Sequence, residues 1–111
     1  MARDTVHDDP EFRELRRMFI LEARERIVEL RTLLETSGDS LPPAARGIRF
    51  RKIAHDLRAA GGSYGFPIVS LYAGEAEDMY VDREAPSAVR TVIEMLAQSL
   101  KQAGELVGVH E

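Results

Sequence analysis

The chain has 111 residues, a formal net charge of −4 at pH 7 and no cysteine. This length predicts a single domain with a small core, and the absence of cysteine excludes disulfides and thiolate chemistry. The acidic charge balance argues against general nucleic-acid binding, which requires a basic face. No apolar run reaches the roughly 20 residues of a membrane span, and the charged N-terminus lacks a signal-peptide core. We therefore expect a cytoplasmic protein that binds neither membranes nor nucleic acid.

Helical periodicity dominates the chain, and the alternation typical of strands is hard to find. Residues 1–9 are predicted to form a flexible N-terminal tail, followed by one domain over residues 10–108. Asp9 and Pro10 suit the start of a first helix that runs to about residue 36. Its predicted core stripe is Phe12, Leu15, Phe19, Ala23, Ile27, Leu30 and Leu34, and its predicted solvent side holds Arg16, Arg24, Glu25 and Arg31.

Three further helices are predicted, each with a proline at its start. The second begins at Pro42 and Pro43, after a turn at residues 37–40 in which Gly38 suits a helix end, and continues into the glycines near residue 62. Gly65 begins the next connection, Pro67 starts the third helix, and a break at residues 82–86 precedes the fourth, which ends at about residue 107. The predicted buried residues are Ile68, Leu71, Tyr72, Ala76 and Met79 on the third helix, and Val89, Ile93, Leu96, Leu100, Ala103 and Val107 on the fourth.

Four amphipathic helices with short connections predict an all-α fold. Short loops force neighbouring helices to run in opposite directions, and four apolar stripes can close on one core. The expected architecture is an antiparallel four-helix bundle with up-down-up-down topology.

The second predicted helix carries His55 on the side opposite its apolar stripe. At about 100° per residue, the residues near the direction of the imidazole are Arg51, Lys52, Arg58, Ala59 and Gly62, and those on the far side are Phe50, Ile53, Leu57, Ala60 and Tyr64. Most histidines of soluble domains have no special task. Exposure, nearby positive charge and a cleared surface are nevertheless what an imidazole needs in order to accept a phosphoryl group from a large partner.

The run from His55 to Phe66 resembles the histidine-containing phosphotransfer (HPt) domains, among them the phosphotransfer domain of chemotaxis histidine kinases. The residues that stand at the positions of the family pattern are His55, Leu57, Arg58, Gly61, Gly62, Gly65 and Phe66. Two positions depart from it. Arg58 replaces the usual lysine and keeps the charge while changing its shape, and Ala59 stands where the family has glycine.

The resemblance implies roles for three side chains. His55 is the phosphorylated residue, with Nε2 as the attacking nitrogen, and Arg58 screens the charge of the phosphoryl group. Glu77 stands 22 positions after the histidine (77 − 55), where chemotaxis-type members have a glutamate that holds Nδ1 protonated; the alternative for Glu77 is a solvated helix residue. Some of these members carry a second histidine 19 positions on, where this chain has Gly74 (74 − 55).

The implied function is that of a stand-alone phosphotransfer protein. Its expected partners are receiver domains of response regulators and a sensor or hybrid histidine kinase, and the chain itself is expected to be a monomer. No cofactor is expected on the chain, because magnesium belongs to the receiver domain. Without an ATP-binding region the chain is expected to be a phosphoryl carrier more than an enzyme. The expected docking residues are Ile48, Arg51, Lys52, Ala59 and Gly62, with burial against the first helix as the alternative for Ile48.

Two other functions stay open at this point. One is a helical adaptor or inhibitor that binds a kinase or receiver without accepting phosphate, and the other is a phosphatase-like module that drains a receiver. A bundle metal site is not expected, because His7 and His110 lie near the chain ends and leave His55 alone. No Gly-x-x-x-x-Gly-Lys run is present to cradle a nucleotide.

Overall fold

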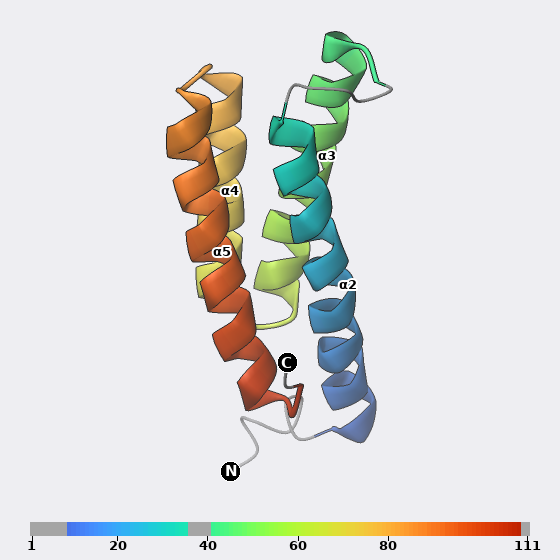
Figure 1. The fold of residues 1–111 in the computed structure, drawn as a ribbon. Coiled ribbons are helices and arrows are strands. Elements are labelled where there is room, and N and C mark those ends of the chain that lie inside the picture. The colour runs from blue at the N-terminus through green and yellow to red at the C-terminus, as the bar shows by residue number, and fades with distance from the viewer. Residues whose placement is uncertain (1–8, 36–40, 110–111) are drawn as a thin grey trace.

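The computed structural model describes residues 9–35 and 41–109, whose regular structure is entirely α-helical (Figure 1). The helices are α2 (Pro10–Leu34), α3 (Pro43–Ser63), α4 (Pro67–Val81) and α5 (Pro86–Leu106). Consecutive helices run in opposite directions, and α2 and α4 each pack against both α3 and α5. The predicted antiparallel four-helix bundle with up-down-up-down topology is confirmed.

The helix starts follow the sequence signals. Each helix has a proline in its first turn, where a backbone N–H has no helical partner in any case. The side chain of Asp9 caps α2 by accepting a hydrogen bond from the backbone N of Glu11 at 3.0 Å. Helix α2 ends at Leu34, slightly earlier than predicted. The predicted turn at residues 37–40 and the predicted tail, Asp9 excepted, lie outside the described residues.

The core lies where the apolar stripes of the four helices meet. All six residues predicted to be buried on the fourth helix are buried, five of them on α5 and Val107 at its C-cap, because the apolar positions recur at steps of three and four residues without interruption. The large side chains with almost no exposed surface come from every helix: Ile20, Leu30, Phe50, Val69, Val89, Ile93 and Leu96.

Three apolar residues predicted to face the core do not. The exposed fractions are 45% for Leu15, 52% for Ile68 and 59% for Leu71. On α4 the inward face is formed by small and medium side chains, Val69, Ala73 and Ala76, and these allow a closer approach to neighbouring helices than larger residues would. Because successive residues differ by about 100° around a helix, the larger residues beside this stripe point outward.

The solvent side predicted for α2 is also partly wrong. Arg16, Arg24 and Arg31 are half-buried, and only Glu25 of that set is exposed. An arginine can cover apolar surface with its stem while its charged end stays at the rim. The apolar periodicity of α2 predicts full exposure for these three arginines, whereas each lies partly against a neighbouring part of the bundle.

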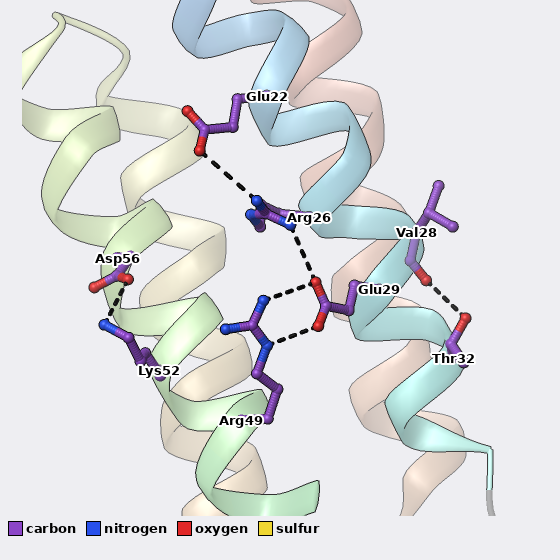
Figure 2. Close-up of polar contacts among 8 residues, drawn as sticks. All are labelled: Glu22, Arg26, Val28, Glu29, Thr32, Arg49, Lys52 and Asp56. Carbon is purple, nitrogen blue, oxygen red and sulfur yellow. Dashed lines mark hydrogen bonds and ion pairs between the residues drawn. The ribbon is translucent and has the colours of Figure 1, made fainter. Parts of the chain in front are cut away.

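Ion pairs tie α2 to two of its neighbours at the bundle surface. Glu29 accepts hydrogen bonds from Arg49 of α3 at 2.7 Å and from Arg26 at 3.1 Å, and Figure 2 shows this network. Arg31 makes two bonds of 2.8 Å to Glu94 of α5. The pairs are partly exposed, so each contributes at most about 1 kcal/mol.

No helix in residues 9–35 and 41–109 has both the length and the apolar character that crossing a bilayer requires.

We expect the Glu29→Gln variant to lose less stability in acid than the wild-type protein does. Hydrogen bonding to Arg49 lowers the pKa of Glu29 below its ordinary value of 4.5. The ion pair therefore stabilises the folded state above that ordinary value, and its contribution is lost as the pH falls through the lowered pKa. The free energy of unfolding, measured with urea between about pH 7 and about pH 3, should fall less steeply in the variant.

The matched control is Glu25→Gln, which removes an exposed carboxylate from the same helix and should retain the wild-type pH dependence. The difference between the two variants should reach at most about 1 kcal/mol. Equal pH dependence in Glu29→Gln and wild type would contradict a stabilising role for the Glu29–Arg49 pair.

Candidate functional site

His55 lies in the middle of α3 on the side turned away from the core. Its side chain is 63% exposed, while Phe50, Ile53 and Leu57 on the opposite side of the helix are buried. Ala59 and Gly62, further along the same side, are exposed and present almost no side chain. A partner as large as a protein domain can therefore reach the imidazole.

The predicted docking residues before His55 extend the same surface. Ile48 is 68% exposed, so of its two predicted placements the exposed one is found. Arg51 and Lys52 are also exposed, and Lys52 pairs with Asp56 at 3.2 Å (Figure 2). We call this surface the His55 face, and it comprises Ile48, Arg51, Lys52, His55, Ala59 and Gly62.

Glu77 reaches the imidazole from α4. Its Oε2 lies 3.4 Å from Nδ1 of His55, and its side chain is only 16% exposed. This distance is slightly longer than a good N–H···O hydrogen bond of up to about 3.2 Å, but a carboxylate so close favours a proton on Nδ1. Nε2 has no hydrogen bond to a residue within the described ranges. It is therefore the ring nitrogen whose lone pair is free.

Arg58 approaches the other oxygen of the same carboxylate. Its Nη1 lies 3.6 Å from Oε1 of Glu77, and its side chain is 52% exposed. That Oε1 atom is buried and accepts no hydrogen bond in the part of the chain that the structure describes. Glu77 thus lies between a neutral or cationic imidazole and a permanent cation, with one oxygen toward each.

Small residues bring α3 and α4 close enough for these contacts. A Cβ on Gly61 would lie 3.1 Å from the backbone N of Ser70 and 3.3 Å from Cγ1 of Val69. The Ser70 hydroxyl donates a hydrogen bond to the carbonyl oxygen of Arg58 at 2.7 Å, across the two helices. A Cβ on Gly62 would meet only Oγ of Ser70, at 3.7 Å. Gly61 therefore serves close packing, and Gly62 keeps the His55 face clear.

Helix α3 ends just beyond this face at a left-handed glycine. Gly65 has φ +82°, a conformation that side chains with a Cβ rarely adopt. The backbone N of Gly65 donates to the carbonyl of Gly62 at 3.2 Å, and the backbone N of Phe66 donates to that of Gly61 at 2.7 Å. These two bonds form a Schellman motif, which turns the chain sharply and starts α4 against α3.

Arg16 reinforces the same turn from α2. Its Nε donates to the carbonyl oxygen of Tyr64 at 2.9 Å, and its guanidinium lies 4.4 Å from the centre of the Phe66 ring. Sequence reasoning missed both Arg16 and Ser70. Each bonds to a backbone carbonyl of α3 or its C-terminal turn, and such a contact leaves no spacing signal in the sequence.

Comparison of the chain with protein-family models, with curated proteins and with solved structures finds no match in any of the three. Within residues 9–35 and 41–109, no group of three or more His, Asp and Glu side chains is placed to hold a metal ion. The arrangement of His55, Arg58 and Glu77 therefore carries the functional argument.

Alanine substitutions at the two adjacent glycines of α3 should change stability in opposite directions. Gly61→Ala pushes a methyl group against the backbone of α4 and should lower the free energy of unfolding by about 1–3 kcal/mol. Gly62→Ala makes only an ordinary van der Waals contact with Oγ of Ser70 and should raise it by about 0.5–1 kcal/mol, because alanine favours the helix. Urea denaturation measures both, and equal stability of the two variants would contradict close packing at Gly61.

Proposed function

We propose that the protein is a histidine phosphotransfer protein of a two-component phosphorelay, which carries a phosphoryl group on His55. The observation that supports this most is the exposed imidazole whose Nδ1 faces the Glu77 carboxylate at 3.4 Å, which leaves Nε2 free. The helical bundle and the resemblance of residues 55–66 to HPt domains point in the same direction. The protein acts as a monomer in the cytoplasm, between receiver domains or between a sensor or hybrid histidine kinase and a receiver.

The transfer step follows from the free lone pair on Nε2. Nε2 attacks the phosphorus of an aspartyl phosphate on the receiver, and the Nε2–P bond forms as the bond from phosphorus to the aspartate oxygen breaks. The electron pair of that bond leaves with the aspartate carboxylate. The ring keeps its Nδ1 proton and becomes cationic, a charge that the nearby carboxylate of Glu77 stabilises. Transfer to a second aspartate reverses these steps.

The remaining residues of the site act on the charge of the phosphoryl group and on the partner. Arg58 is half-exposed and can turn its guanidinium toward the phosphoryl oxygens. Magnesium is bound by the acidic pocket of the receiver, and this chain supplies no cofactor. Arg51 and Lys52 attract that acidic pocket during encounter, and Ile48 offers an apolar contact beside them.

Radioactive phosphoryl transfer tests the proposal directly. Wild type, incubated with a panel of labelled phosphoreceivers and hybrid kinases, should acquire label that is lost in acid and stable in base, as a phosphoramidate is. His55→Gln should acquire none, because the accepting nitrogen is gone. The matched control is the double variant His7→Gln/His110→Gln, which leaves His55 as the sole histidine and should be labelled like wild type.

Other outcomes of this experiment lead to the alternative functions. Equal labelling of His55→Gln and wild type would refute transfer through His55. Stable binding of a receiver without label on any variant would indicate the adaptor or inhibitor. Loss of phosphate from the receiver without a lasting phosphohistidine would indicate a phosphatase-like module.

Long side chains on the His55 face should slow transfer from a protein donor selectively. We expect Gly62→Gln and Ala59→Gln to reduce the transfer rate from a phosphoreceiver about tenfold, which corresponds to about 1.4 kcal/mol, with helicity by circular dichroism unchanged. Phosphorylation by phosphoramidate, a donor too small to need docking, should keep the wild-type rate. Thr91→Gln on the exposed side of α5 is the control; equal slowing of both donors would contradict a docking role for this face.

A further inference from the structure

Gly74 lies on α4 one turn before Glu77 and beneath the side chain of Arg58. A Cβ on Gly74 would lie 3.1 Å from Cδ of Arg58, 3.2 Å from Nε and 3.6 Å from Cζ. The first two distances are tighter than ordinary van der Waals contact. The arginine side chain therefore crosses α4 through space that any residue other than glycine would partly fill.

The neighbours of Gly74 differ in kind from those of Gly61. A Cβ on Gly61 would press on the backbone of α4, whereas the three atoms nearest to a Cβ on Gly74 all belong to the Arg58 side chain. Gly61 thus allows the close approach of α3 and α4. Gly74 instead leaves room for one side chain, that of Arg58, which reaches over from α3.

The path of the Arg58 side chain across α4 matters because it brings the guanidinium to Glu77. Its Nη1 lies 3.6 Å from the buried Oε1 of Glu77, the oxygen that His55 does not use. A buried carboxylate oxygen that accepts no hydrogen bond is costly, and the guanidinium charge offsets part of that cost. Without this cation we expect the carboxylate of Glu77 to turn toward water, and Oε2 then leaves Nδ1 of His55.

We propose that Gly74 is a positioning residue for the imidazole of His55. Its missing side chain lets Arg58 lie across α4 and hold Glu77, and Glu77 in turn keeps the proton of the neutral ring on Nδ1. The effect on transfer rests on the proposed function, since a free Nε2 lone pair is what attacks phosphorus. The structural part, the dependence of the tautomer on residue 74, stands independently of it.

The tautomer of His55 measures this arrangement without any phosphoryl transfer. In protein with ¹⁵N-labelled histidine, at about pH 9 where an ordinary imidazole is neutral, the nitrogen chemical shifts report the ratio of Nδ1–H to Nε2–H forms. We expect mainly Nδ1–H in wild type and at least a twofold lower ratio in Gly74→Ala. Gly47→Ala makes the same change on α3, where a Cβ would meet Tyr80 instead, and should keep the wild-type ratio.

A double-variant cycle separates an effect through Arg58 from a general effect on the helix. Arg58→Ala should lower the Nδ1–H ratio as Gly74→Ala does, and the double variant should match Arg58→Ala alone, because the side chain that contacts residue 74 is absent. If Gly74→Ala fails to fold, the double variant, in which the contacting atoms are removed, and Arg58→Ala alone still measure the contribution of Arg58.

Three results would overturn the inference: an unchanged ratio in Gly74→Ala, an unchanged ratio in Arg58→Ala, or a Gly74→Ala effect of equal size with and without Arg58. The rate of phosphorylation by phosphoramidate connects it to function, and Gly74→Ala should slow this rate severalfold. Unlabelled wild-type protein in the transfer experiment would refute the proposed function while leaving the tautomer result intact.

Discussion

The close approach of α3 and α4 is the constraint on which the candidate site depends. Gly61 lets the backbone of α4 lie against α3, and the Ser70 hydroxyl bonds to an α3 carbonyl. At the other end of this helix pair, the Phe50 and Tyr80 rings stack with centroids 4.1 Å apart. Glu77 lies between these two contacts on α4, and its Oε2 reaches to 3.4 Å from Nδ1 of His55 on α3.

The contact between α2 and α3 is of a different kind. It includes the Glu29–Arg49 pair, whose side chains are 31% and 39% exposed and which water and salt weaken. The α3–α4 contact combines the backbone approach at Gly61, the hydrogen bond from Ser70 to the Arg58 carbonyl and the stacked rings of Phe50 and Tyr80. The Arg58–Glu77 ion pair lies at its edge. His55 and Glu77 are therefore attached to a helix pair whose backbone approach and ring stacking do not depend on charge.

Much of the fold could be predicted from the helical periodicity of apolar residues and from the residues that start and end helices. Five prolines near helix starts, the Asp9 cap and Gly65 gave helix positions close to those in the structure. Periodicity was less informative on α4, because its inward face consists of Val69, Ala73 and Ala76 and its larger apolar residues, Ile68 and Leu71, are outside. A hydrophobicity pattern ranks residues by size and apolarity, whereas close packing of helices selects small ones.

The candidate site could be predicted only in part for a related reason. The exposure of His55 follows from its helical phase, and the position of Glu77 came from the family resemblance. The features that hold the site join residues of two different helices: Ser70 bonds to the Arg58 carbonyl, and the Arg58 stem lies where a Cβ on Gly74 would press against it. A glycine in a predicted helix indicates that another group packs closely there, but the sequence does not show which side chain that group belongs to.

In the proposed function, the same three side chains balance charge both before and after transfer. Before transfer the imidazole is neutral and the Glu77 carboxylate is offset by Arg58 at 3.6 Å. After transfer the ring is cationic and offsets Glu77 from 3.4 Å, so Arg58 is released to meet the negative phosphoryl oxygens. A long, half-exposed cation held by a loose contact suits this exchange better than a short hydrogen-bonded pair, because a tighter bond to Glu77 would have to be broken at the moment the phosphoryl group arrives.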